Sequence, residues 1–193
     1  MSDDAYPTPP DPLPDGWVLV ERETRTRFEL PTMDVREHTL VYEDEGLRTR
    51  VREATAVDRT WRFLFASALS FRPPLPPVTG PASMYATVAA EARDGFAADL
   101  RDRGVRDLDR RRTERTRTAS GDRVQLTPYR GRLPVREFDR PVDVAGWLGI
   151  WITDGSFRLA GGGYPEAGLE VDDVAIDGSR YRDELLDLIR RVG

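Results

Sequence analysis

Lysine, cysteine and asparagine are absent from this chain, and histidine occurs once, as His38. Without cysteine the protein has no thiol nucleophile, no thiolate-bound zinc and no iron–sulfur cluster. Without lysine it cannot form a Schiff base, anchor pyridoxal phosphate or supply the lysine of a phosphate-binding loop. A single histidine cannot build a multi-histidine metal site. We therefore name no catalytic residue and predict no cofactor and no metal site.

His38 is the one side chain that could act as the base of a Ser-His-Asp triad. The sequence contains no G-x-S-x-G segment to supply the nucleophilic serine. His38 follows Glu37 in a segment that alternates like a strand, where a lone histidine is typically a surface or packed residue. Carboxylate chemistry remains available, because a pair of carboxylates is defined by its separation in space rather than in sequence.

All 29 basic residues are arginine, and Asp is more frequent than Glu. This composition is typical of salt-adapted proteins, because screening in concentrated salt makes dense surface carboxylates tolerable. A GC-rich codon bias produces the same composition without any physical cause. The net charge of −5 provides no basic field to attract phosphates, so we expect no nucleic-acid partner.

The first 15 residues contain five prolines and no apolar face, which predicts a disordered arm over 1–15 followed by a single domain over 16–193. This segment has neither the basic nor the apolar region of a signal peptide. No apolar run approaches the length of a membrane span. We therefore expect a cytoplasmic protein without a membrane partner.

Strand-like alternation dominates 17–71, with segments at Trp17–Val20, Glu37–Glu43, Leu47–Val57 and Thr60–Phe71. Short turns between such strands predict an antiparallel meander. The segment Thr60–Phe71 is apolar on both faces, which predicts a central strand covered on each side.

A long amphipathic helix is predicted over 81–103, because apolar residues recur there every four positions. Further strands are predicted around the turns Gly121-Asp122 and Asp154-Gly155, and a second helix over 180–191 with Ser179 as its N-cap. The fold class is therefore α+β, with a largely antiparallel sheet, a long central helix and a C-terminal helix in a single-domain sandwich.

Three segments invite functional interpretations. Asp172, Asp173 and Asp177 could supply oxygen ligands to a cation, but their spacing matches no EF-hand loop and a turn explains them. The arginines within 110–117 could bind nucleic acid or an acidic partner, although neighbouring carboxylates partly neutralise them and few aromatics accompany them. Exposed amides of Gly161–Gly163 could cradle an anion, or these glycines could form a bulge.

We predict the functional surface near the end of the chain. Trp147 and Trp151 are four residues apart in a predicted strand and so share one face. Arg158 on the returning strand could add a guanidinium beside them, and glycines let another backbone approach closely. The predicted docking residues are Trp147, Trp151, Arg158, Gly161, Gly162, Gly163 and Tyr164.

The segments 61–65, 92–96 and 159–165 resemble those of uncharacterised haloarchaeal proteins. The order of the predicted elements also resembles the Mog1/PsbP-type α/β/α sandwich across most of residues 17–192. Known members of that fold are mainly non-enzymatic binding or accessory proteins.

The resemblance and the missing catalytic groups together predict a non-catalytic cytosolic binding or accessory protein with a possible protein partner. The alternative is a carboxylate-dependent hydrolase, either metal-assisted or glycosidase-like.

Overall fold

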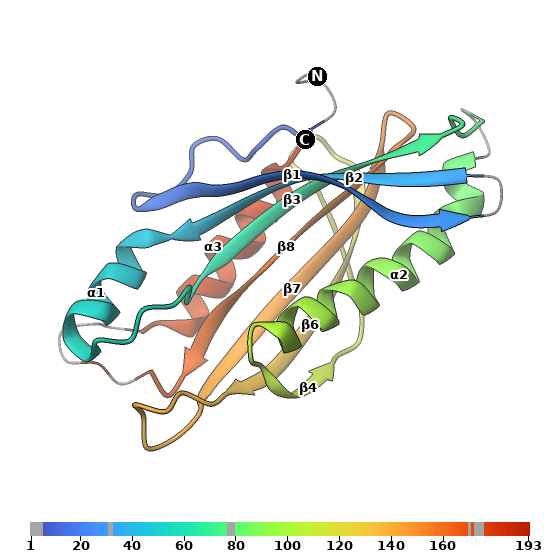
Figure 1. Cartoon of the computed structure of the whole chain (residues 1–193). Coiled ribbons are helices and arrows are strands. Elements are labelled where there is room, and N and C mark those ends of the chain that lie inside the picture. Colours follow the sequence, from blue (N-terminus) through green and yellow to red (C-terminus); the bar gives the residue numbers. More distant parts are fainter. Residues whose placement is uncertain (1–5, 31–32, 77–79, 170, 172–175) are drawn as a thin grey trace.

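One antiparallel sheet organises the chain in the computed structural model, which describes residues 6–30, 33–76, 80–169, 171 and 176–193 (Figure 1). The elements are β1 (Trp17–Leu30), β2 (Met33–Asp44), α1 (Glu45–Thr55), β3 (Phe63–Arg72), α2 (Gly80–Asp102), β4 (Arg106–Arg110), β5 (Glu114–Arg117), β6 (Arg123–Leu133), β7 (Val142–Thr153), β8 (Ser156–Ala167) and α3 (Gly178–Arg191). Every strand pair among these residues is antiparallel, which confirms the α+β class.

The strand order is β1-β2-β3-β8-β7-β6-β4, and β5 also pairs with β6. An N-terminal meander, β1-β2-β3, therefore joins a C-terminal group of strands through the pairing of β3 with β8. That pairing runs from Phe63 opposite Gly163 to Ala68 opposite Arg158. The glycine-rich part of β8 consequently lies in the middle of the sheet.

The two long helices lie on opposite faces of this sheet (Figure 1). A Cβ atom at Gly146 would meet Phe96 and Leu100 of α2, whereas one at Gly149 would meet Ile189 of α3. Positions three apart in a strand point to opposite faces. We call these the α2 face and the α3 face.

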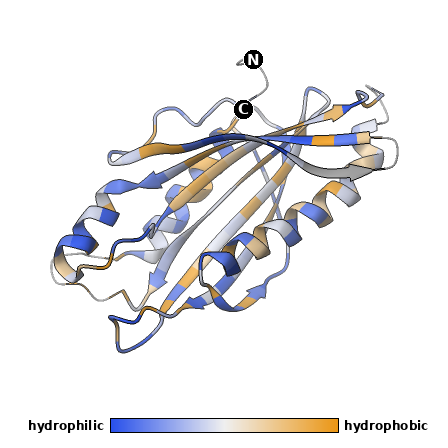
Figure 2. Cartoon of the chain, viewed as in Figure 1, coloured by the Kyte–Doolittle hydropathy of each residue, from blue (hydrophilic) through white to orange (hydrophobic). Residues whose placement is uncertain are grey.

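Helix α2 confirms the predicted helix over 81–103 within one residue at each end. Its buried positions Val88, Ala92, Phe96 and Leu100 recur every four residues and pack on the sheet. Phe96 contacts the rings of Phe65 and Tyr129, with centroids 5.7 and 5.1 Å away. Figure 2 shows the contrast between the largely hydrophobic β3 and the largely hydrophilic α1.

The predicted strand at Leu47–Val57 is wrong, because residues 45–55 form helix α1. Leu47 and Val51 are both buried, and a spacing of four satisfies the two-residue period of a strand as well as the helical period. The N-cap decides between them: Asp44 accepts a hydrogen bond from the backbone N–H of Leu47 at 2.8 Å.

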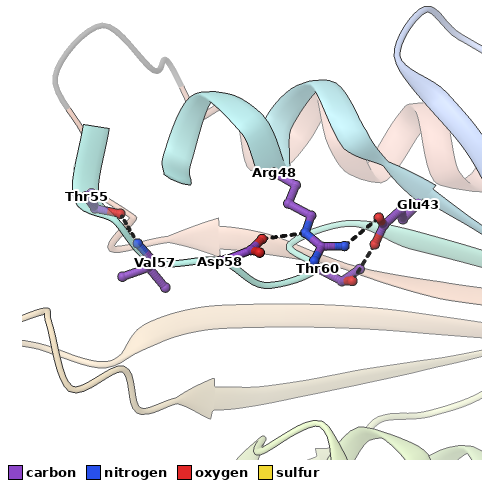
Figure 3. A network of polar contacts seen from close by, with 6 residues as sticks. All are labelled: Glu43, Arg48, Thr55, Val57, Asp58 and Thr60. Atoms are coloured by element: carbon purple, nitrogen blue, oxygen red, sulfur yellow. Dashed lines mark hydrogen bonds and ion pairs between the residues drawn. The ribbon is translucent and has the colours of Figure 1, made fainter. Parts of the chain in front are cut away.

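A polar network fixes α1 to the sheet (Figure 3). Arg48 donates from Nη1 to Glu43 at 2.8 Å and from Nε to Asp58 at 2.6 Å. Thr60 donates to the second oxygen of Glu43. The hydrogen bonds to Asp58 and Glu43 raise the pKa of Arg48, and the bond from Arg48 lowers the pKa of Asp58. Glu43 is thus buried with its charge compensated.

Both predicted hairpin turns are confirmed, with positive φ at Gly121 and at Asp154 and Gly155. Strand β8 is longer than the predicted segment 156–160. Helix α3 begins at Gly178, and its cap is Asp177 rather than Ser179, because Asp177 accepts from the N–H of Arg180.

Part of the expected disordered arm lies against the domain. Thr8 exchanges two backbone hydrogen bonds with Gly193, of 3.0 and 3.1 Å, and Arg191 donates to the carbonyl of Pro12. The guanidinium of Arg22 lies 4.1 Å from the ring centroid of Tyr6. The described arm therefore connects β1 with the end of the chain.

Candidate functional site

The predicted aromatic docking surface is not exposed. Trp147 is 6% exposed and Trp151 is 1% exposed, both on the α3 face. The Nε1 of Trp147 donates to the hydroxyl of Tyr164 at 3.4 Å, and burial is the main cause that raises the pKa of Tyr164. Helix α3 of the same chain covers this face: it contacts mainly β8, and also β7 and β3.

Gly161, Gly162 and Gly163 form neither an exposed anion cradle nor a bulge, because they are buried in the regularly paired part of β8. A Cβ at Gly161 would lie 2.7 Å from the ring of Phe65, and one at Gly163 would lie 2.9 Å from the ring of Phe63. Their backbone amides belong to a central strand that is paired on both sides. The glycines make room for packed rings and do not form an exposed anion cradle.

Arg158 lies opposite Trp151, so the predicted proximity of these two residues is present. The Nε of Arg158 donates to the backbone carbonyl of Gly193 at 3.2 Å, which ties β8 to the end of the chain. The arginine near Trp147 is instead Arg182 of α3, at 5.6 Å from the ring. The structure therefore separates the seven predicted residues between two faces and buries most of them.

His38 lies in a chain of side chains that links the arm to three strands. Its Nε2 is 2.9 Å from the hydroxyl of Ser70 and its Nδ1 is 2.9 Å from the hydroxyl of Thr24, which in turn contacts Tyr6. A serine and a histidine at this distance are the usual partners of a nucleophile and its base. The third position, where a triad has a carboxylate, is held here by Thr24. We assign this row of hydrogen-bonded side chains a structural role, since it joins the arm, β1, β2 and β3.

We expect the pKa of His38 to lie below that of an exposed histidine, because burial and then the charge of Arg36 disfavour the imidazolium. The unfolded chain then binds the proton more readily, so the contribution of His38 to stability is complete above a pH of about 6.5 and declines on acidification. An NMR titration measures this pKa without ambiguity, because His38 is the single histidine of the sequence. The variant Arg36→Gln should raise the pKa of His38. A measured pKa at or above that of the unfolded chain would contradict this prediction.

The candidate cation ligands Asp172 and Asp173 lie outside the described residues, and Asp177 is used as the cap of α3. Among the residues that the structure describes, no group of three or more Asp, Glu or His side chains is arranged to hold a metal ion.

A broad groove lies where the start of α2, the β5–β6 hairpin and the end of α3 meet. Its volume is about 1350 Å³, and we call it the arginine groove. Its lining residues are Ala82, Tyr85, Arg115, Thr116, Arg117, Arg123, Val124, Gln125, Ile152 and Arg190. The four arginines are all exposed, and no carboxylate is among the described residues that line the groove.

Strand alternation separates the charges of the arginine-rich segment. Glu114 pairs with Leu126 and so points to the α3 face, whereas Arg115 and Arg117 point to the other side. Within the described part of the chain, the four groove arginines have no carboxylate at ion-pair distance. By contrast, Arg111 pairs with Asp109 at 2.8 Å. The expected neutralisation therefore holds only for the first half of this segment.

Arg117 lies directly opposite Arg123 in the β5–β6 pair. Like charges in this position repel each other and destabilise a sheet. Arg117 also donates to the carbonyl of Gly121 at 2.6 Å, which holds its guanidinium at the hairpin. Both guanidinium groups stay exposed at this edge, and neither forms an ion pair with a described carboxylate.

A second hollow, of about 310 Å³, lies between α2 and the sheet on the α2 face, and we call it the carboxylate cleft. Its apolar lining is Val41, Phe63, Phe65, Ala92, Phe96, Leu148 and Leu159, and its polar lining is Glu21, Arg25, Glu37, Thr39, Asp99, Asp102 and Arg103. Glu37 and Thr39 are each 5% exposed. The hydroxyl of Thr39 contacts that of buried Ser67 at 2.8 Å.

Sequence reasoning missed both hollows for different reasons. Arg115 and Arg117 lie in the segment 110–117 that was singled out, but their separation from Glu114 follows from the strand register, and Arg123 and Arg190 lie outside that segment. The cleft combines residues from β1, β2, β3, α2, β7 and β8, and only the tertiary fold brings them together. The partial signal for the cleft was Asp99, Asp102 and Arg103 at the end of the amphipathic helix.

Comparison with known proteins identifies the family but no activity. No helix within the described residues has the length and apolar character that crossing a membrane requires. No curated protein matches the chain. The sequence matches the family described as "Domain of unknown function (DUF6517)" over residues 6–193, and the chain therefore belongs to this family.

Proposed function

We propose that this protein is a non-catalytic binding protein whose arginine groove holds an acidic segment of a partner protein. The observation that carries the proposal is the gathering of Arg115, Arg117, Arg123 and Arg190 around one open hollow in a chain of net charge −5. Local positive charge on an acidic protein favours a specific acidic partner over general attraction to polyanions.

Two features of the lining favour a polypeptide over a nucleic acid as the occupant of the groove. Tyr85 is the single aromatic side chain among the described residues of the groove, and it already stacks on Phe157 at 6.1 Å. Binding to single-stranded nucleic acid typically uses several free aromatic faces. The groove also contains the apolar side chains of Ala82 and Ile152, which suit the side chains of a peptide.

The edge of the sheet supports the same choice. In the described sheet β5 pairs with β6 on one side and with no strand on the other. An extended segment can therefore add main-chain hydrogen bonds along β5 while its carboxylates meet Arg115 and Arg117. Arginine suits this role, because its planar guanidinium forms paired hydrogen bonds with a carboxylate.

We expect a fluorescein-labelled peptide of repeated Glu-Glu-Leu to bind, and its Gln-Gln-Leu counterpart not to bind. The triple variant Arg115→Ser/Arg117→Ser/Arg123→Ser should weaken binding about tenfold, since three exposed pairs contribute about 0.5 kcal/mol each. Fluorescence anisotropy at several salt concentrations measures this, and the affinity should fall as salt rises.

The matched control is Arg52→Ser/Arg101→Ser/Arg136→Ser, which removes the same charge from exposed positions outside the groove. It should leave the peptide affinity within about twofold, as expected for surface charges away from the contact. An equal loss in both triple variants, or tighter binding of a dT12 oligonucleotide than of the acidic peptide, would refute the proposal.

A carboxylate-dependent hydrolase is the second candidate, and the cleft is the observation that favours it. Glu37 is buried inside, and Asp99 and Asp102 lie on the opposite wall. Two carboxylates across a cleft are the arrangement that glycoside hydrolysis uses. Turnover of p-nitrophenyl glycosides that is abolished by Glu37→Gln would support this function, and no turnover across a panel of sugars would count against it.

The composition supports a salt-adapted haloarchaeal source and a cytoplasmic location, and we include both in this proposal. The resemblance to the Mog1/PsbP-type sandwich fits a binding or accessory role. A free energy of unfolding that is at least as high in molar KCl as in about 0.1 M KCl would agree with a salt-adapted source.

A further inference from the structure

We propose that a third hollow, formed by the end of α2, by β6 and β7 and by the segment before β3, binds a small organic carboxylate with an apolar body. The volume of this hollow is about 40 Å³, and we call it the indole pocket because Trp61 is part of its lining. The indole pocket and the arginine groove share no lining residue, so this proposal does not depend on the proposed function.

Two buried N–H groups of the lining have no hydrogen-bond partner among the described residues, the Nε1 of Trp61 and the Nε of Arg59. Trp61 is 4% exposed, and the guanidinium of Arg59 lies 5.5 Å from the centroid of its ring. The other buried nitrogens of this kind, on Arg62, Trp151 and Arg191, belong to residues outside the lining. Buried polar groups are nearly always hydrogen-bonded, and both groups here are donors, so the group that satisfies them is an acceptor.

The charge of the lining favours an anionic acceptor. The charged side chains among the described lining residues are Arg59, Arg103 and Arg130, without a carboxylate. Arg130 already pairs with Glu166 at 2.7 Å. Neither Arg59 nor Arg103 has a described carboxylate at ion-pair distance. Two guanidinium groups are therefore available to pair with a carboxylate in the pocket.

The surroundings of Arg59 and Arg103 agree with this choice. Arg59 donates from Nη2 to the backbone carbonyl of Arg103 at 2.9 Å, which holds its guanidinium at the pocket. Partial burial lowers the pKa of both arginines, because each guanidinium gives up hydration. Carboxylates outside the lining act in the opposite direction, Glu137 on Arg59, and Asp99, Glu21 and Glu43 on Arg103. A bound carboxylate would replace part of the lost hydration with a direct partner.

The rest of the pocket suits a short apolar body. Leu100 of α2, Leu133 of β6 and Val144 of β7 belong to the lining. Gly146 and Gly163 lie opposite each other in the β7–β8 pair and leave this part of the lining without side chains. A volume of about 40 Å³ admits a carboxylate group with a few carbon atoms, since one water molecule needs about 10–15 Å³.

The probe is 3-methylbutanoate, and 3-methylbutylammonium is its cationic counterpart. The indole N–H of Trp61 is one of four such NMR signals of the full chain, and Trp61→Phe assigns it. In a carboxylate-free buffer we expect 3-methylbutanoate to move this signal downfield, as a hydrogen bond to a carboxylate does, with half-saturation at or below about 20 mM. The ammonium probe should not move it. No saturable shift would mean that water alone satisfies the buried N–H groups and would overturn the proposal, as would shifts confined to β5 and β6.

Arg59→Gln should weaken 3-methylbutanoate binding roughly tenfold, because it removes the charge beside the indole. Trp61→Phe keeps a ring beside Phe138 and removes the N–H, so it should fold normally and weaken binding roughly three- to tenfold, followed by the backbone amides of the pocket. The control Arg101→Gln removes the same charge from an exposed position of α2 outside the pocket and should change the affinity less than about twofold.

Equal losses in Arg59→Gln and Arg101→Gln would assign the effect to net charge and overturn the site, and so would an unchanged affinity in Trp61→Phe. The triple variant of the arginine groove should bind 3-methylbutanoate as the unmodified protein does, since the two hollows share no residue. The two proposals can therefore fail independently of each other.

Discussion

Arg62→Ala should lower the free energy of unfolding by about 3–5 kcal/mol, the range found when one partner of a buried ion pair is removed. Arg62 is 4% exposed, and its Nη1 donates to Asp44 at 2.8 Å. Without the guanidinium, Asp44 remains buried and loses its ion-pair partner, while the N–H of Leu47 still donates to its other oxygen. Urea denaturation followed by circular dichroism measures the effect.

The effect is large because Arg62 joins four parts of the fold. Its guanidinium lies 5.1 Å from the ring of Trp17 at the start of β1 and 3.9 Å from the ring of Tyr181 in α3. It also forms an ion pair with Glu184 of α3. Asp44, its partner at the end of β2, caps α1. The loss of Arg62 therefore reaches α1 through its cap and α3 through its two contacts.

A double-mutant comparison separates the buried charge from the lost packing. Arg62→Met keeps an apolar side chain of similar length but should still cost nearly as much as Arg62→Ala, because Asp44 stays charged. Adding Asp44→Asn, which keeps a capping oxygen, should recover part of the stability. The exposed Arg101→Ala is the control and should change stability by less than about 0.5 kcal/mol. If Arg62→Ala behaves like Arg101→Ala, the central role of this residue is wrong.

The sequence predicted the elements whose periods are unambiguous. Apolar residues recur every four positions along the 23 residues of helix α2, and Asp-Gly is a strong signal for a two-residue hairpin turn. Both elements were therefore located correctly. Helix α1 was missed because Leu47 and Val51 fit both a strand and a helix over so short a segment. Its cap, Asp44, was readable, but it lies in an acidic turn that equally suits a hairpin.

The functional surfaces depend on facts that a single sequence does not contain. Arg115 and Arg117 face away from Glu114 because of the register between β5 and β6. Trp147 and Trp151 have the composition of an interface, yet α3 returns from the end of the chain to cover their face. Composition can therefore identify side chains capable of recognition, but which of them remain exposed is decided by how the last helix packs.

The triple glycine shows the same limit, because glycine serves close packing as readily as it serves loops. Gly162 lies between Leu64 of β3 and Trp147 of β7 in the centre of the sheet. A Cβ there would lie 2.1 Å from the backbone oxygen of Phe63 and 2.8 Å from Leu185 of α3. Neither strand can move without disturbing its other neighbour, so the clash has no inexpensive relief.

Gly162→Ala should therefore lower the free energy of unfolding by about 3 kcal/mol or more, at the upper end of the costs of overpacking a core. The matched control is Gly46→Ala in α1, where the nearest atoms to the new Cβ lie at 3.4 Å. That change should raise the free energy of unfolding by about 0.5–1 kcal/mol, since alanine has a higher helix propensity than glycine. Urea denaturation of both variants measures the difference. Equal stabilities would mean that the glycines of β8 are not required by packing and would reopen the question of a functional role for this segment.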